Sequence, residues 1–152
     1  MKYEEAEKFR YLILAAQRQG NRLLNEKLRG VALTSSQAEV IQVLKTYQPI
    51  TLKELGSLLV CETGSPSRLM NRLIEEGVIE RVPNQEDKRS SFLQLTNEGE
   101  KLSESIQSLE DELYEGFMSV LSEEEMKQVN HAVGKLMVSI SDPIALEKRN
   151  LL

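Results

Sequence analysis

Residues 64–77 read Gly64-Ser65-Pro66-Ser67-Arg68-Leu69-Met70-Asn71-Arg72-Leu73-Ile74-Glu75-Glu76-Gly77, a sequence that predicts one short helix with both ends marked. Ser65 can cap the N-terminus, and Pro66 suits the first helical position, where its missing N–H would have no partner. Gly77 supplies the C-terminal stop. A buried face is predicted by the apolar residues at helical spacing, Leu69, Leu73 and Ile74.

The other face of this helix is polar and basic. It carries Ser65, Ser67, Arg68, Asn71 and Arg72. Short hydroxyl and amide groups and guanidinium forks suit phosphate oxygens and base edges, so this face is a candidate DNA-binding surface. An ordinary solvated helix face would look similar, and these fourteen residues alone favour that simpler interpretation. The residues that follow reverse the balance.

Directly after Gly77 the periodicity changes from helical to that of strands. Residues 78–82 are rich in β-formers, and residues 92–95 alternate at period two. Between them, residues 83–90 form a polar, turn-forming loop that includes Asp87, Lys88 and Arg89. The pattern predicts a β-hairpin with a charged tip behind the helix, which is the arrangement of a wing that contacts DNA.

Two helices are predicted before residue 64. Thr34 and Gln37 form a capping box that opens a helix closed by Pro49, and Thr51 and Glu54 form a second box that opens a short helix through about Val60. A connection containing Gly64 then leads to residues 65–77. Three helices in succession, the last two joined by a tight turn, predict a helix-turn-helix.

Long amphipathic helices are predicted on both sides of this core. Residues 3–29 carry one apolar stripe, Thr96 caps a helix from Asn97 to about Leu121, and Ser122 opens a last helix that ends at Asp142-Pro143. The tail, residues 144–152, is ambiguous. We therefore expect one domain over residues 1–152, mainly α with a small β-hairpin wing (an α/β winged helix). The winged helix-turn-helix would span residues 33–96, and residues 3–29 and 100–141 would be dimerisation helices, because their stripes exceed what one small winged helix can cover.

Composition sets further bounds. The net charge is −5, but residues 97–126 carry ten acidic groups and one lysine, so the acidity is local and net charge is a poor guide to partners. No apolar run approaches the roughly 20 residues that span a bilayer, and the N-terminus lacks a signal-peptide apolar region. A single cysteine, Cys61, excludes an internal disulfide and fits a reducing cytoplasm. We expect a cytoplasmic protein.

The chain resembles the MarR family of bacterial winged helix-turn-helix transcriptional regulators. Residues 87–99 fit the family's wing signature, with Asp87 and Arg89 two residues apart, followed by Leu95-Thr96 and Gly99. Residues 33–37 are similar to the entry of the family's second helix, and residues 65–69 to its recognition helix. The resemblance covers residues 3–141.

The resemblance implies a homodimer on a pseudo-palindromic operator, most simply a ligand-responsive repressor. Arg89 would enter the minor groove at the wing tip, where a narrow groove concentrates negative potential. Asp87 would hold the Arg89 guanidinium by a charge-assisted pair, and Lys88 would contact phosphate. The major groove would be faced by Ser65, Ser67, Arg68, Asn71 and Arg72. The resemblance also implies a small aromatic or phenolic effector, whose binding residues the sequence does not identify.

Three alternative functions compete with this prediction. An enzyme is disfavoured, because one histidine and one cysteine assemble no nucleophile–base pair and no phosphate-binding glycine motif is present. No cofactor or metal is expected. A thiol-based redox sensor through Cys61 is conceivable, since a cysteine near a helix N-terminus can be reactive, but a packed side chain is the commoner role. A winged helix used only for protein contacts is disfavoured by the arginines of residues 65–77 and of the wing.

Overall fold

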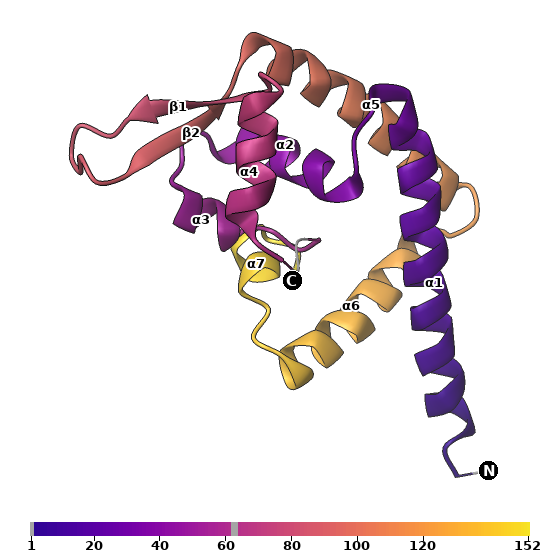
Figure 1. Cartoon of the computed structure of the whole chain (residues 1–152). Coiled ribbons are helices and arrows are strands. Elements are labelled where there is room, and N and C mark those ends of the chain that lie inside the picture. The colour runs from indigo at the N-terminus through magenta and orange to yellow at the C-terminus, as the bar shows by residue number, and fades with distance from the viewer. Residues whose placement is uncertain (1, 62–63) are drawn as a thin grey trace.

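The computed structural model describes residues 2–61 and 64–152, and helices make up most of it (Figure 1). The elements in chain order are α1 (Glu4–Leu28), the 3₁₀ turn η1 (Arg29–Val31), α2 (Ser35–Tyr47), α3 (Leu52–Gly56), α4 (Pro66–Glu75), β1 (Ile79–Pro83), β2 (Ser91–Leu95), α5 (Asn97–Met118), α6 (Glu123–Ile140) and α7 (Ile144–Lys148). The predicted fold class is confirmed: a helix-turn-helix is followed by a two-stranded antiparallel wing and flanked by long helices. Within the described residues, the helices are too short or too polar to span a membrane.

Local capping explains where most helices begin. The side chains of Thr34, Thr51 and Ser122 each accept from the backbone N–H three residues on, and the Gln or Glu there accepts from the cap residue's N–H. Each pair satisfies two donors that a helix start leaves without partners. Thr96 caps α5 by accepting from the Gly99 N–H at 3.2 Å. The predicted starts of these four helices are confirmed.

The core is centred on α2, which packs against α1, α3, α5 and β2. Its side chains Val40, Ile41 and Leu44 are fully buried. The other helices and the strands contribute further fully buried side chains, Leu28, Leu55, Leu73, Leu93 and Ile106. Complete burial of such side chains contributes about 1.5–3 kcal/mol each, so this cluster fixes α4 and the wing on a common support.

The base of the wing is tied to the surrounding helices. Ile79 pairs with Leu95 at the inner end of the hairpin and Pro83 with Ser91 at the outer end. Ile50, between α2 and α3, adds an isolated bridge to Leu93 through two backbone hydrogen bonds of 3.3 and 2.7 Å. The sequence pattern did not predict this bridge. It fixes the hairpin to the helix-turn-helix rather than leaving it as a free arm.

Thr96 and Gly99 join the end of α4 to the start of α5. The Thr96 hydroxyl donates to the carbonyl of Gly77 at 2.6 Å, and its backbone N–H donates to the carbonyl of Val78 at 3.0 Å. A Cβ atom on Gly99 would lie 2.2 Å from the Val78 carbonyl oxygen, so only glycine allows α5 to approach this closely. The Leu-Thr and Gly positions of the wing signature are therefore a packing joint beneath the wing.

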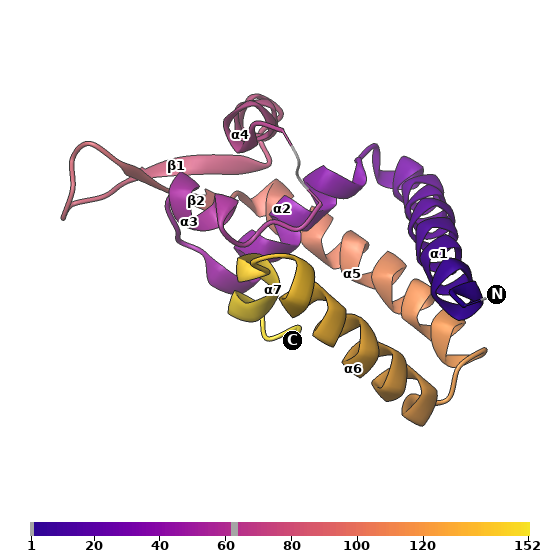
Figure 2. The same ribbon diagram turned by 90° about the horizontal axis from the view of Figure 1, so that it is seen from below.

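Helices α1 and α6 lie at the periphery of the molecule (Figures 1 and 2), and both leave apolar side chains exposed. On α1, Phe9 and Leu12 are 41% and 63% exposed, and on α6, Val129 and Ile140 are 50% and 66% exposed. Apolar side chains that recur along one face of a helix and remain exposed indicate a surface that another molecule covers.

Two expectations about boundaries are wrong. Helix α3 ends at Gly56 rather than near Val60, because the Ser57 hydroxyl bonds back to the Glu54 carbonyl at 2.7 Å and the Leu58 N–H closes a tighter turn onto Leu55. Helix α5 ends at Met118 rather than Leu121, and the ambiguous tail contains the short helix α7. The connection before Gly64 includes residues 62 and 63, which lie outside the described residues.

Candidate nucleic-acid interface

Both ends of α4 are built as its sequence requires, with one exception. Pro66 occupies the first helical position, and Gly77 has a positive φ of 73°. Behind it, the Gly77 N–H bonds to Ile74 and the Val78 N–H to Leu73, each at 3.0 Å, which satisfies the last carbonyls of the helix. Ser65 has the backbone conformation of a cap, but its hydroxyl makes no capping bond, so the prediction that Ser65 caps α4 is wrong. Its hydroxyl is not committed to the helix.

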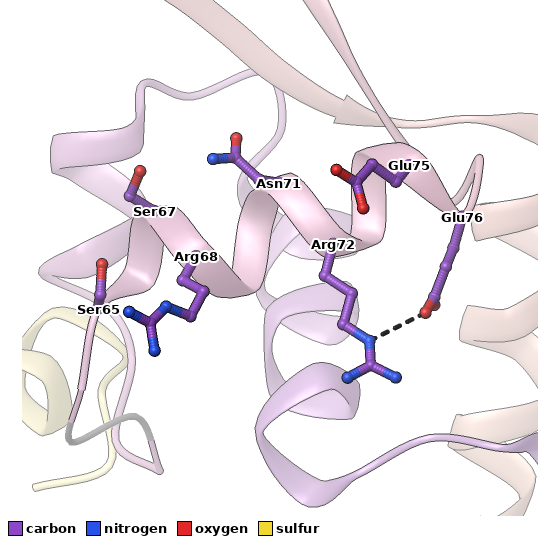
Figure 3. A pocket seen from close by; sticks show the side chains of 7 residues that line it. All are labelled: Ser65, Ser67, Arg68, Asn71, Arg72, Glu75 and Glu76. Atoms are coloured by element: carbon purple, nitrogen blue, oxygen red, sulfur yellow. Dashed lines mark hydrogen bonds and ion pairs between the residues drawn. The ribbon is translucent and has the colours of Figure 1, made fainter.

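The predicted faces of α4 are observed. Leu73 is buried, Leu69 and Ile74 are half-buried, and Met70, which the prediction missed, is 1% exposed. The opposite face is exposed, and its polar side chains line one shallow depression on the surface, Ser65, Ser67, Arg68, Asn71, Arg72, Glu75 and Glu76 (Figure 3). All five residues that the sequence singled out on this helix therefore lie together.

The electrostatics of this face are mixed. Arg72 Nε lies 3.1 Å from Glu76 Oε1, an exposed pair four residues apart, and Arg68 extends beside it without an ion-pair partner among the described residues (Figure 3). Exposed pairs of this kind contribute only about 0.3–0.5 kcal/mol, so a phosphate group can displace Glu76 from Arg72. The carboxylates of Glu75 and Glu76 lie at the C-terminal end of this face, so its positive charge is concentrated in the N-terminal half, around Arg68.

Arg81 connects the helix to the wing, and sequence reasoning missed it. From β1, its guanidinium donates to Asn71 Oδ1 at 3.2 Å and to Ser91 Oγ at 3.4 Å. One exposed arginine thus bridges α4, β1 and β2. The signal that could have found it is its place on the strand that follows α4, four residues after Gly77, as a basic residue between strand-forming neighbours.

The wing tip is an ordered turn rather than a loose loop. Asn84 Oδ1 accepts from the N–H groups of Glu86 and Asp87 at 3.1 and 3.3 Å, while Asn84 Nδ2 donates to Ser90 Oγ at 3.1 Å. Asp87 Oδ1 accepts from the backbone N–H of Arg89 at 3.0 Å. These bonds use side chains to imitate backbone turns, and they leave Lys88 and Arg89 exposed at the tip.

The predicted role of Asp87 needs correction. Its carboxylate holds the backbone of Arg89, and among residues 2–61 and 64–152 no ion pair joins it to the Arg89 guanidinium. A carboxylate two residues ahead reaches a backbone N–H within the same turn more readily than the end of a long side chain. Asp87 shapes the turn, and the Arg89 side chain extends from it.

The site therefore has two parts. The α4 group (Ser65, Ser67, Arg68, Asn71 and Arg72) lies on one helix face, and the wing group (Asp87, Lys88 and Arg89) lies at the far end of the hairpin (Figure 1). The hairpin separates the two groups, and Arg81 bonds with Ser91 of β2 and with Asn71 of α4. A helix and a separate basic tip on a rigid support can contact two grooves of one duplex.

Cys61 is exposed, but its surroundings disfavour the thiolate form. Burial, together with the hydrogen bond and charge of Glu39, raises the pKa of its thiol to about 11, and Arg149 offsets this only in part. The thiolate is the reactive form, so a raised pKa disfavours oxidation chemistry at neutral pH. This weighs against the redox-sensing alternative.

Comparison with known proteins identifies relatives of both the sequence and the fold. A winged helix DNA-binding domain family matches residues 33–99. The HTH-type transcriptional regulator MgrA of Staphylococcus aureus is 30% identical over 123 residues, which are 80% of this chain and 82% of MgrA. A cysteine-to-serine mutant of MarR from Escherichia coli, crystallised with operator DNA, superposes with a TM-score of 0.78 at 28% identity, covering 89% of this chain and 97% of that chain. The apo form of wild-type MarR gives 0.67 at 29% identity, covering 84% and 94%.

Proposed function

The chain belongs to the MarR family of winged-helix transcriptional regulators, and from this premise we propose how it binds DNA: as a homodimer, on an inverted-repeat operator. The observation that carries the proposal is the exposed polar face of α4, which lies beside a wing with a basic tip on the same support. A DNA-binding regulator acts where the chromosome lies, which in bacteria is the cytoplasm.

The contacts follow from the chemistry of the two groups. In the α4 group, Arg68 and Arg72 can bind guanine edges or phosphates through their forks, and Asn71 can bind adenine. Serine hydroxyls and the backbone N–H groups in the first turn of α4 suit phosphate oxygens. At the wing, Arg89 would enter the minor groove and Lys88 would contact phosphate. The polar residues would thus read sequence through α4 and groove shape through the wing.

The dimer is supported by the exposed apolar side chains of α1 and α6, which a second copy would cover. Two-fold symmetry would present two α4 helices to the duplex, so the half-sites would be related by an inverted repeat. For recognition helices in successive major grooves, their separation is about one helical turn, roughly 34–36 Å.

Ligand-responsive repression is the regulatory mode we propose, on the ground of family membership. A cavity of ≈ 240 Å³ lies between the dimerisation helices and the winged helix, lined among others by Leu24 of α1, Gln42 of α2 and Glu110 of α5. A small aromatic or phenolic acid bound there would change how α1 and α5 sit against α2, and with it the spacing of the two α4 helices. Titrating operator affinity against a panel of such acids tests this step.

Selection from a random duplex library tests the central proposal. The full chain should enrich a palindromic consensus with half-sites about one helical turn apart. Enrichment without a palindrome would contradict the dimeric mode. Failure to retain any duplex at low salt would instead favour the winged helix as a protein-contact module, because phosphate contacts alone give non-specific binding at low salt.

A further inference from the structure

The C-terminal tail, residues 142–152, is a built element that folds back onto the winged helix. Pro143 precedes α7, and two residues after its end Asn150 has a φ of 54°, a left-handed conformation that asparagine tolerates. The Leu151 N–H returns to the carbonyl of Leu146 at 2.9 Å and closes the turn. Asn150 and this hydrogen bond therefore end α7 in an ordered turn, which fixes the course of the last residues of the tail.

Polar contacts fix the tail to the helix-turn-helix. The Lys148 carbonyl accepts from the Tyr47 hydroxyl at 3.4 Å, and Lys148 Nζ donates to Ser57 Oγ at 2.8 Å. Arg149 Nη1 donates to Glu39 Oε1 at 2.7 Å and to the Leu58 carbonyl at 3.4 Å. In Figure 1 the tail, with α7, lies beside α3.

Glu39 is the centre of this contact. Its side chain is 8% exposed, and besides Arg149 it binds two backbone groups. Oε1 accepts from the Val60 N–H at 2.5 Å and Oε2 from the Cys61 N–H at 2.6 Å. Val60 and Cys61 belong to the segment between α3 and α4, so this one carboxylate of α2 holds the turn of the helix-turn-helix.

We propose that Glu39 and Arg149 are positioning residues for DNA recognition: Glu39 fixes the segment that leads to α4, and Arg149 keeps the Glu39 carboxylate in place. A buried carboxylate is costly unless it is paired, so without Arg149 it would turn towards water and release Val60 and Cys61. The inference rests on the proposed DNA-binding function.

A pair of tail variants of the full chain tests this role. Arg149→Gln and Lys148→Gln each remove one positive charge, from adjacent residues, but only Arg149 binds Glu39. We expect Arg149→Gln to weaken operator binding by about 3- to 30-fold, the range for mutations that act through a packed network, and Lys148→Gln by less than about 2-fold. Equal losses would mean that the tail acts only through its charge and would overturn the proposal.

Hydrogen exchange without DNA gives an independent readout. The Val60 and Cys61 amides should exchange faster in Arg149→Gln, while the amides of α5 keep their wild-type protection. Glu39→Gln, which leaves one acceptor oxygen for two amides, should show the same local change and comparable loss of affinity, and the double variant should lose little beyond the worse single variant. Wild-type exchange and affinity in Glu39→Gln would refute the role, even if Arg149→Gln proved unfolded. If the wild-type chain bound no DNA, the proposed function would fail, while the exchange data would still decide whether the tail holds the turn.

Discussion

Arg89 and Lys88 are adjacent and exposed and each carries one positive charge, so their replacement separates a positioned contact from general charge. Arg89→Ala should weaken operator binding by about 1–3 kcal/mol if the guanidinium lies in the minor groove. Lys88→Ala should be milder, lower affinity for all sequences alike and reduce the salt slope by about one unit. Titrations at two salt concentrations measure both quantities. Equal losses from the two variants would indicate a merely basic loop.

Asp87 accepts a hydrogen bond that holds the turn carrying Arg89. Substitutions at Asp87 can therefore separate the effect of this hydrogen bond from the effect of the negative charge. Asp87→Ala removes the acceptor for the Arg89 N–H and should cost about 0.5–1.5 kcal/mol of operator binding, less than Arg89→Ala. Removal of a carboxylate near phosphates offsets part of that loss. Asp87→Asn is the matched control: it keeps an acceptor oxygen without the charge and should bind at least as tightly as the wild type. Tighter binding by Asp87→Ala would refute the turn-forming role.

The thiol of Cys61 provides a pH-dependent prediction. With a pKa of about 11, its alkylation rate in the folded protein should still be rising at pH 10, because the thiolate fraction is small below the pKa. An unperturbed cysteine, with a pKa of about 8.5, would approach its plateau near pH 9.5. Rates of iodoacetamide labelling from pH 7 to 10, with circular dichroism to confirm the fold, measure this. A plateau by pH 9.5 would restore the redox-sensing alternative.

At the scale of elements, the joint between the wing and α5 depends on Gly99. Gly99→Ala should destabilise the fold by about 1–3 kcal/mol, because the added methyl group meets the Val78 carbonyl and the Leu95 side chain. Gly116→Ala on the same helix is the control, since a Cβ there would meet none of the described residues within 4 Å and alanine favours helix by about 1 kcal/mol. Urea unfolding gives both free energies. A Gly99→Ala variant as stable as the wild type would contradict the close approach.

The elements that the sequence predicted are those with local signals. Thr34, Thr51 and Ser122 act within one turn, and the caps they predicted are observed. One bond that sequence reasoning missed is long-range: Arg149 and Glu39 are 110 residues apart, and no local pattern marks their contact. Local signals can also mislead. Ser65 is a residue type that commonly caps helices and has the backbone conformation of a cap, but its side chain makes no capping hydrogen bond.

The positions of the site residues were predictable for the same reason. Helical spacing placed the α4 group on one face, and the polar loop between two strands placed the wing group at a tip. The partners of Asp87 and Arg81 depend on the conformation of the hairpin and on its position relative to α4. Residue spacing within one segment does not specify either of these.

At the scale of the whole molecule, the exposed stripes of α1 and α6 predict a homodimer. Sedimentation at micromolar concentration should give twice the 17.3 kDa of one chain. Leu12→Glu places a charge on the α1 stripe, where Leu12 is 63% exposed, and should shift the equilibrium towards monomer. Arg18→Glu, on the other side of the same helix, should leave the dimer intact. A monomeric wild type would contradict the interface.

The uneven charge of the chain has a consequence for how it meets DNA. Residues 104–125 carry eight acidic side chains and no basic one, and they lie across the molecule from the wing (Figure 1). At physiological ionic strength the Debye length is about 8 Å, so a duplex near the wing responds to the wing and α4 and hardly at all to that acidic end. At 0.01 M salt the Debye length grows to about 30 Å, and the repulsion of the acidic end then reaches the duplex as well. Dilute buffer should therefore slow association in most orientations and favour approach with the wing towards the duplex. Added salt first screens the repulsion from the acidic end and then the attraction to the wing and α4, so the association rate constant for DNA should pass through a maximum as the salt concentration rises.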